Sequence, residues 1–156
     1  MNAYRVDKRL FDVGDVVTQT GEYLTKLDCE HALVEQYLAC KRPDSKPSRD
    51  EVLFVFASRV AAERFRTNEV NGKLYEVNIQ APLLHRGDMN LTNEILQARA
   101  DSARAGALAE RYWRGQESAC PQIELLVKVA IVVSVIFTTE AERRRAFAAR
   151  AGIQLP

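Results

Sequence analysis

Two neighbouring runs of β-branched residues near the C-terminus constrain the fold of this chain most. They cover Ile123–Val127 and Val129–Phe137, and Lys128 alone separates them. Nearly continuous apolar runs rich in β-branched residues are typical of strands buried inside a sheet. The apolar stretch is also too short to span a membrane, because a membrane helix needs about 20 apolar residues. The pattern predicts two central strands, with a turn or a bulge at Lys128.

Further elements follow from hydrophobic periodicity and from turn residues. Period-two alternation predicts a strand over Lys73–Ile79, after an Asn71-Gly72 turn, and an apolar run predicts another over Val52–Phe56. Tyr4–Val6 is another expected strand, and Val13–Val17 follows it with a turn at Gly14. The expected helices are Glu30–Cys40, with Asp28 as N-cap, Arg59–Arg66, with Ser58 as N-cap, Asn93–Trp113 and Glu140–Ala151. Lys41–Asp50 and His85–Thr92 are expected to be loops.

The order of these elements is not a regular alternation of strands and helices. It therefore favours an α+β fold, with a mixed β-sheet and flanking helices in one domain over residues 1–156. The glycine-rich dinucleotide fingerprint, the P-loop, the zinc-protease motif and the hydrolase elbow are all absent from the sequence. The common nucleotide-binding and hydrolase folds are thereby disfavoured.

Charge and cysteine content exclude other classes. Twenty-two basic and 21 acidic residues give a net charge of +1, so bulk attraction to nucleic acid or to a membrane is not indicated. Three scattered cysteines and two histidines match no zinc spacing, so we expect no metal and free thiols in a reducing compartment. A cytoplasmic location is expected, or delivery as an effector without a classical signal peptide. Two interpretations stay open for the arginines of the last helix: a solvent-exposed helix face, or a local patch that binds nucleic acid. The residues are Arg143, Arg144, Arg145 and Arg150.

Several segments in the first 95 residues resemble the rifampin ADP-ribosyltransferases. The segments are Tyr4-Arg5-Val6, Val13-Gly14-Asp15, Leu53–Ser58 followed by Ala61-Ala62, Gly72–Val77, and Asp88-Met89-Asn90-Leu91-Thr92. They correspond to the first strand, the Val-Gly-Asp step, the strand-to-helix step, the next strand and the Asp-Pro-Asn-x-Thr loop of that family. Where the family carries a histidine in the first strand and a tyrosine in the second, this chain has Arg5 and Phe54.

A later segment resembles a second branch of the same superfamily. Gln122-Ile123-Glu124 is similar to the Gln-x-Glu strand of the arginine-serine-glutamate class of ADP-ribosylating toxins, and Ser58 stands where that class has a Ser-Thr-Ser motif. The resemblance implies a split sheet that grips NAD, and a bacterial, toxin-like enzyme that transfers ADP-ribose from NAD and releases nicotinamide. The acceptor is then a protein, a nucleic acid or a small molecule, and hydrolysis of NAD is the outcome without an acceptor.

The resemblance assigns three main roles. Arg5 would hold NAD on its phosphate side, because a guanidinium fork fits phosphate geometry. Ser58 would shape the nicotinamide pocket, and Glu124 would stabilise the oxocarbenium-like centre on the ribose. Gln122 lies on the same strand face as Glu124 and would help choose the acceptor. In the resembling toxins a glutamine at this position disfavours arginine as the target side chain. These roles require Arg5, Ser58 and Glu124 to converge in one cleft.

Four further residues are candidate NAD contacts, namely Tyr4, Phe54, Phe56 and Asp88, the last as a second carboxylate. Each candidate also has a structural alternative. Ser58 is also explained as a helix cap, and Asp88 as a turn residue. Glu124 is also explained as a strand-edge residue that faces solvent, and the two phenylalanines as core residues. The alternative function is a non-catalytic binding module on this fold, or a partner of a toxin system such as a cognate antitoxin. No membrane partner is expected.

Overall fold

The computed structural model describes residues 1–69 and 71–153; within the last helix, the side chains at positions 140, 142, 143, 146, 147 and 150 lie outside this description. The strands are β1 (Asn2–Asp7), β2 (Val16–Thr18), β3 (Leu53–Phe56), β4 (Lys73–Ile79), β5 (His85–Asp88), β6 (Ile123–Val127) and β7 (Val129–Phe137). The helices are α1 (Cys29–Cys40), α2 (Arg59–Thr67), α3 (Met89–Gln97), α4 (Ser102–Trp113) and α5 (Glu140–Ala151), with short 3-10 turns η1 (Leu24–Lys26) and η2 (Arg49–Glu51).

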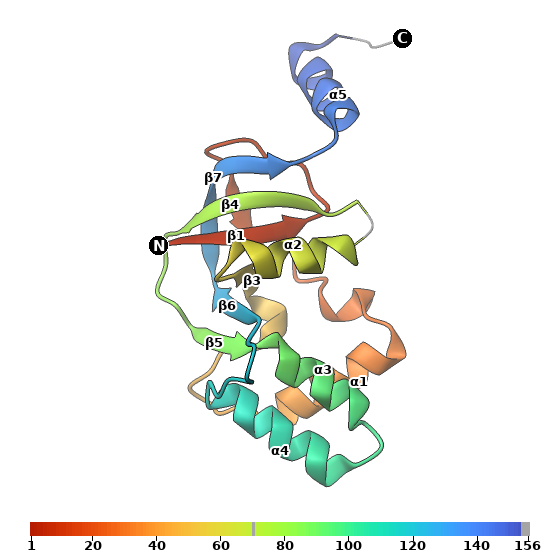
Figure 1. The fold of residues 1–156 in the computed structure, drawn as a ribbon. Coiled ribbons are helices and arrows are strands. Elements are labelled where there is room, and N and C mark those ends of the chain that lie inside the picture. The colour runs from red at the N-terminus through yellow and green to blue at the C-terminus, as the bar shows by residue number, and fades with distance from the viewer. Residues whose placement is uncertain (70, 154–156) are drawn as a thin grey trace.

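The α+β class is confirmed, but the expected mixed sheet is not found. In the described part of the chain, the seven strands form one sheet in the order β2-β7-β4-β1-β3-β6-β5 (Figure 1). Every pairing between neighbours is antiparallel. The reason is the place of β1, which lies between β3 and β4. These two strands are joined through α2 and run parallel to each other, yet β1 keeps them from pairing.

The sheet is strongly curled, and the link between β6 and β7 shows why. Lys128 is the single residue between these strands, yet β4, β1 and β3 lie between them in the sheet. A flat sheet would hold β6 and β7 about 19 Å apart, whereas two Cα–Cα steps span at most about 7.6 Å. The sheet must therefore curve until both strands meet at Lys128. The expected turn or bulge at Lys128 is confirmed as a bend, and both strands keep their predicted bounds. Neither strand is central, because each lies one position from an edge.

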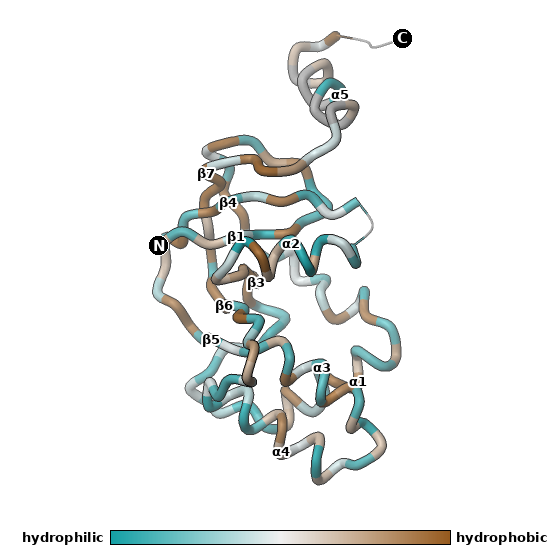
Figure 2. The backbone as a smooth tube through the Cα atoms, viewed as in Figure 1, coloured by the Kyte–Doolittle hydropathy of each residue, from teal (hydrophilic) through white to brown (hydrophobic). Residues whose placement is uncertain are grey.

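The curl gives the sheet an enclosed face and an outer face. The enclosed face has its own apolar core from six strands, whose largest fully buried side chain is that of Tyr75. Two further cores cover the outer face, one beneath α1, α3 and α4 and one beneath α2. In Figure 2 the hydrophobic, brown parts of the chain are prominent along strands such as β7 and β3. Which face a strand residue occupies therefore decides which core or site it joins.

The helix expected over Asn93–Trp113 is two helices. The chain turns after Gln97, and Asp101 begins α4 by accepting a hydrogen bond from the Arg104 amide at 3.0 Å. The loop expected over His85–Thr92 is also wrong, since it contains β5 and the start of α3. Asp28 and Ser58 cap α1 and α2 as predicted. No helix in the described ranges is long and apolar enough to cross a bilayer.

Candidate functional site

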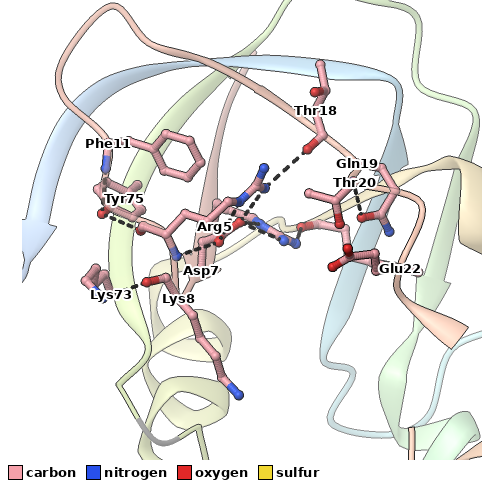
Figure 3. A network of polar contacts seen from close by, with 12 residues as sticks. Arg5, Asp7, Lys8, Phe11, Thr18, Gln19, Thr20, Glu22, Lys73 and Tyr75 are labelled. Carbon is pink, nitrogen blue, oxygen red and sulfur yellow. Dashed lines mark hydrogen bonds and ion pairs between the residues drawn. The ribbon is translucent and has the colours of Figure 1, made fainter. Parts of the chain in front are cut away.

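A pair of arginines shares one carboxylate at the end of β1. The Asp7 carboxylate accepts from Arg5 Nε at 3.1 Å and Nη2 at 2.9 Å, and from Arg9 Nε at 3.0 Å and Nη2 at 2.8 Å. Arg5 Nη1 also donates to the Phe54 carbonyl of the neighbouring strand β3 at 2.7 Å. Figure 3 shows Arg5 and Asp7 facing the segment that carries Thr18, Gln19, Thr20 and Glu22. We refer to Arg5, Asp7 and Arg9 as the Arg5 site.

The Arg5 site carries one net positive charge. Burial would raise the pKa of the Asp7 carboxyl, but the hydrogen bonds from Arg9 and the charge of Arg5 hold that pKa at about 2. Burial lowers the pKa of the Arg5 guanidinium, which the Asp7 carboxylate opposes. Asp7 is therefore ionised at neutral pH and neutralises one of the two guanidinium groups. The second positive charge is left without an anion among the site's own residues.

Arg9 is the more accessible of the two arginines. Its side chain is 38% exposed, against 17% for Arg5. The Tyr75 hydroxyl fixes its backbone by donating to the Arg9 carbonyl at 3.1 Å, and Arg9 Nη2 donates to the Thr18 carbonyl at 3.2 Å. The guanidinium lies 4.9 Å from the centre of the Phe11 ring. Among the described residues, Arg9 Nη1 has no hydrogen-bond partner, so it has two N–H groups for a ligand.

A second polar network encloses Glu124, the predicted catalytic carboxylate. Glu124 is 3% exposed, and its Oε1 accepts from Arg49 Nη1 at 2.7 Å and from the Tyr112 hydroxyl at 2.7 Å. Arg49 Nη1 also donates to the Tyr112 hydroxyl. A buried carboxylate is costly unless paired, and here the guanidinium and the phenol satisfy it. Glu124 is thus buried and paired with Arg49 rather than on a solvent-facing strand edge.

Arg49 is the centre of this network. Its Nε donates to both oxygens of Glu35, at 3.1 and 2.9 Å, and its guanidinium carbon lies 4.6 Å from the centre of the Phe54 ring. Burial would lower the pKa of this guanidinium, but Glu124, the Tyr112 oxygen and Glu35 raise it well above its ordinary value. Tyr23 completes the set by donating to Glu35 at 2.8 Å. We call Arg49, Glu35, Glu124, Tyr112 and Tyr23 the Arg49 network.

Arg5 and Glu124 lie on opposite faces of the sheet. Tyr4 pairs with Phe56 on β3, and Phe56 pairs with Glu124 on β6, so these three side chains share the outer face. Arg5 follows Tyr4 and pairs with Tyr75, so it points to the enclosed face. The expected convergence of Arg5, Ser58 and Glu124 in one cleft is therefore not found. The cause is the strand register. It pairs Tyr4, and not Arg5, with the residues that lie beside Glu124, and neighbouring residues of a strand point to opposite faces.

The structure does bring Ser58, Asp88 and Gln122 to one end of the sheet. Ser58 follows β3, where the Ala57 amide donates to the Ile123 carbonyl, and its hydroxyl accepts from the Ala61 amide at 3.2 Å. Asp88 caps α3 through the Asn90 amide and also accepts from the amides of Ser118 and Gln122. The capping alternatives are thus observed for Ser58 and Asp88. Their roles toward NAD, and that of Gln122 toward an acceptor, stay predictions.

The aromatic candidates divide among different surroundings. Tyr4 and Phe56 pack in the core beneath α2, while the Phe54 ring lies between Arg49 and Tyr23, 4.9 Å from the Tyr23 ring centre.

Of the arginines proposed as a nucleic-acid patch, Arg144 and Arg145 are exposed on α5. The side chains of Arg143 and Arg150 lie outside the described residues. Within those residues, no group of three or more potential metal ligands is close enough to hold an ion.

Sequence reasoning missed Arg9 and Arg49. Arg49 lies in a stretch interpreted as a loop, where an arginine carries no special signal. The available hint was indirect: a glutamate inside the most apolar strand pair requires a buried cation. Arg9 stands four residues after Arg5, and only the observed turn beyond β1 returns it to Asp7.

No protein-family model matches the chain, and no curated protein matches it either.

His85 will make stability fall as pH is lowered below about 6.5. It packs against Tyr112 and Trp113, and burial lowers its pKa from 6.5 to about 4. Between these values the unfolded chain binds a proton that the folded chain excludes, so the free energy of unfolding decreases toward pH 4 by about 3 kcal/mol. Urea unfolding from pH 7.5 to 4 measures this slope. His85→Gln, which keeps a side-chain N–H donor, should flatten it, and an unchanged slope would assign it to other groups.

Proposed function

We propose that this chain binds NAD at the Arg5 site, as a binding module with an ADP-ribosyltransferase-like fold. The observation that carries the proposal is the pair of guanidinium groups, Arg5 and Arg9, that share the single Asp7 carboxylate. Guanidinium groups are the preferred side chains for phosphate oxygens, and a fixed pair matches the two neighbouring charges of a pyrophosphate. The net positive charge of Arg5, Asp7 and Arg9 favours an anionic ligand at this place, since the nearby Glu22 carboxylate is already paired with Lys26.

Neighbouring groups support a nucleotide over a bare anion. The Arg9 Nη1 group has both N–H bonds available among the described contacts, and the partly buried Phe11 ring lies beside the same guanidinium. The segment from Thr18 to Glu22 adds hydroxyl, amide and carboxylate groups along the site (Figure 3). Such groups are suited to a ribose, whose hydroxyls both donate and accept hydrogen bonds.

ADP-ribosyl transfer from NAD is the second candidate. The observation favouring it is that the three strands resembling the superfamily's motifs, β1, β3 and β6, are direct neighbours although they lie far apart in sequence. Ser58, Gln122 and Asp88 gather at the end of two of them. Against it stands the enclosure of Glu124, whose Oε1 accepts from Arg49 and Tyr112. A carboxylate held in this way does not face a developing oxocarbenium ion, so the binding module has the stronger support.

Arg9→Gln tests the proposed NAD site. We expect NAD binding to the wild-type chain by isothermal titration calorimetry at millimolar ligand, and an affinity at least ten times weaker for the variant, because it loses a charge-assisted contact. Arg59→Gln is the matched control, since Arg59 is an exposed arginine that pairs with Glu63 on α2. Equal affinities of the Arg9 and Arg59 variants, or no heat from the wild type, would refute the proposal.

The same preparations decide between binding and transfer. Incubation with NAD should release no nicotinamide if the protein is a binding module. Release that disappears in Glu124→Gln but persists in Glu63→Gln, both with unchanged unfolding midpoints, would establish the transferase instead. Glutamine is chosen over alanine because it retains an oxygen that can accept from Arg49 and Tyr112 and so limits damage to the fold.

A further inference from the structure

A cavity of about 240 Å³ adjoins the Arg49 network. Its walls come from α1, from the segment around η1, from η2 and from the end of α4. Arg49 and Glu35 line it together with Leu24, Leu27, Gln36 and Trp113. Arg5 points to the opposite, enclosed face of the sheet, so this cavity is separate from the proposed NAD site.

Arg49 lines this cavity and keeps a spare hydrogen-bond donor. Its side chain is 8% exposed, and Nε and Nη1 are bonded to Glu35, Tyr112 and Glu124. Nη2 has no hydrogen-bond partner among the described residues. It is not one of the fully buried polar atoms that lack a partner. Nη2 therefore has some exposed surface, and Arg49 is one of the residues that line the cavity. A buried, rigidly held guanidinium with a spare N–H is suited to bind a ligand acceptor.

The surrounding charges select against an anion. Arg49 is bonded to two buried carboxylates, Glu35 and Glu124, so these three residues carry a net charge of −1. Arg42 and Asp50 also line the cavity, and their opposite charges offset each other. Glu35 and Gln36 add acceptors to the cavity wall beside the Arg49 donor. A ligand that satisfies both needs an acceptor and a donor side by side and no negative charge of its own, because an anion would meet the excess carboxylate at close range.

The apolar walls indicate a flat ring. Leu24, Leu27 and Trp113 supply apolar surface, and Leu24 is 45% exposed. An engineered cavity of about 150 Å³ holds benzene, so this one admits a somewhat larger ring. We propose that the cavity binds a neutral nucleobase-type ring, with a ring carbonyl or nitrogen accepting from Arg49 and a ring N–H or amino group donating to Glu35 or Gln36.

The protein's one tryptophan reports on this cavity, because Trp113 lines it. We expect saturable changes in Trp113 emission, excited at 295 nm, on titration with uracil or with adenine, with a Kd of about 1 mM as for other small fragments. Orotate is the matched anion, being uracil with a carboxylate, and should bind at least ten times more weakly. Preference for adenine over uracil would assign the site to purines, and the reverse to pyrimidines.

Ala39→Leu tests the location, since Ala39 is an exposed residue of α1 that lines the cavity. The larger side chain should weaken binding at least tenfold. Ala107→Leu makes the same change at an exposed position of α4 outside the cavity lining and should bind as the wild type does. The proposal is overturned if neither base gives a saturable signal up to 20 mM, on the order of twenty times the expected Kd, if orotate binds as well as uracil, or if the two leucine variants behave alike.

Discussion

Replacing Arg49 by leucine will destabilise the protein by about 3–5 kcal/mol at pH 7. The substitution leaves Glu35 and Glu124, 8% and 3% exposed, without the cation that pairs with both of them. An unpaired buried carboxylate must either stay charged at high cost or take up a proton. Urea unfolding followed by circular dichroism, with the wild type measured in parallel, gives the difference in the free energy of unfolding.

The pH dependence of this loss identifies its cause. Without Arg49, a buried carboxyl costs less free energy in its protonated form than as a charged carboxylate. The cost is therefore greatest at neutral pH and shrinks as pH falls toward about 4, where both states are protonated. Arg99→Leu is the control, because Arg99 forms an exposed ion pair with Glu30 that is worth at most about 1 kcal/mol. A loss that is similar for both variants, or independent of pH, would show that Arg49 acts only by packing.

Gly87→Ala will destabilise the protein by about 3 kcal/mol or more, although it adds a single methyl group. A Cβ at position 87 would lie 2.5 Å from Tyr112 Cζ and 2.8 Å from its hydroxyl oxygen. Tyr112 is fully buried, so its ring has no room to retreat, and overpacking alone costs roughly 1–3 kcal/mol. Displacing the ring also breaks its hydrogen bond to Glu124, which pairs with Gly87 across β5 and β6.

Gly106→Ala is the matched control for this substitution. Gly106 is also buried, but its added Cβ would meet the flexible end of the Lys41 side chain at 3.2 Å. Alanine is favoured over glycine inside a helix by up to about 1 kcal/mol, so this variant should be as stable as the wild type or more stable. Thermal unfolding should give a lower midpoint for Gly87→Ala than for the wild type, and an equal or higher midpoint for Gly106→Ala. A neutral Gly87→Ala would mean that Tyr112 is not held against β5.

The sequence pattern predicted individual elements well where one local signal dominated. Lys73–Ile79, Ile123–Val127, Val129–Phe137 and Glu140–Ala151 have their predicted bounds. β5 was missed because His85-Arg86-Gly87-Asp88 has charges and a glycine where a strand pattern expects apolar residues; the glycine is there to admit Tyr112. α3 and α4 were merged because the alanine-rich spacing continues across their junction, and the cap at Asp101 was not recognised.

The candidate site was harder to predict, for a physical reason. Alternation along one strand shows that Tyr4 and Arg5 face opposite ways, but it does not show which of them shares a face with Glu124. That depends on the pairing of Tyr4 with Phe56 and of Phe56 with Glu124, which long-range packing decides. Likewise, Glu124 called for a buried partner, but nothing local distinguished Arg49 from the other arginines of the chain.

The single-residue link at Lys128 has a consequence for how the protein is made. β1, β3 and β4 are all complete by residue 79, and together they form the middle of the sheet. Until residues 123–137 leave the ribosome, this three-stranded intermediate has two unpaired edges, which are open to aggregation. One continuous segment then closes both edges, β6 against β3 and β7 against β4. A nascent chain stalled before this segment is therefore the form of the protein most in need of a chaperone.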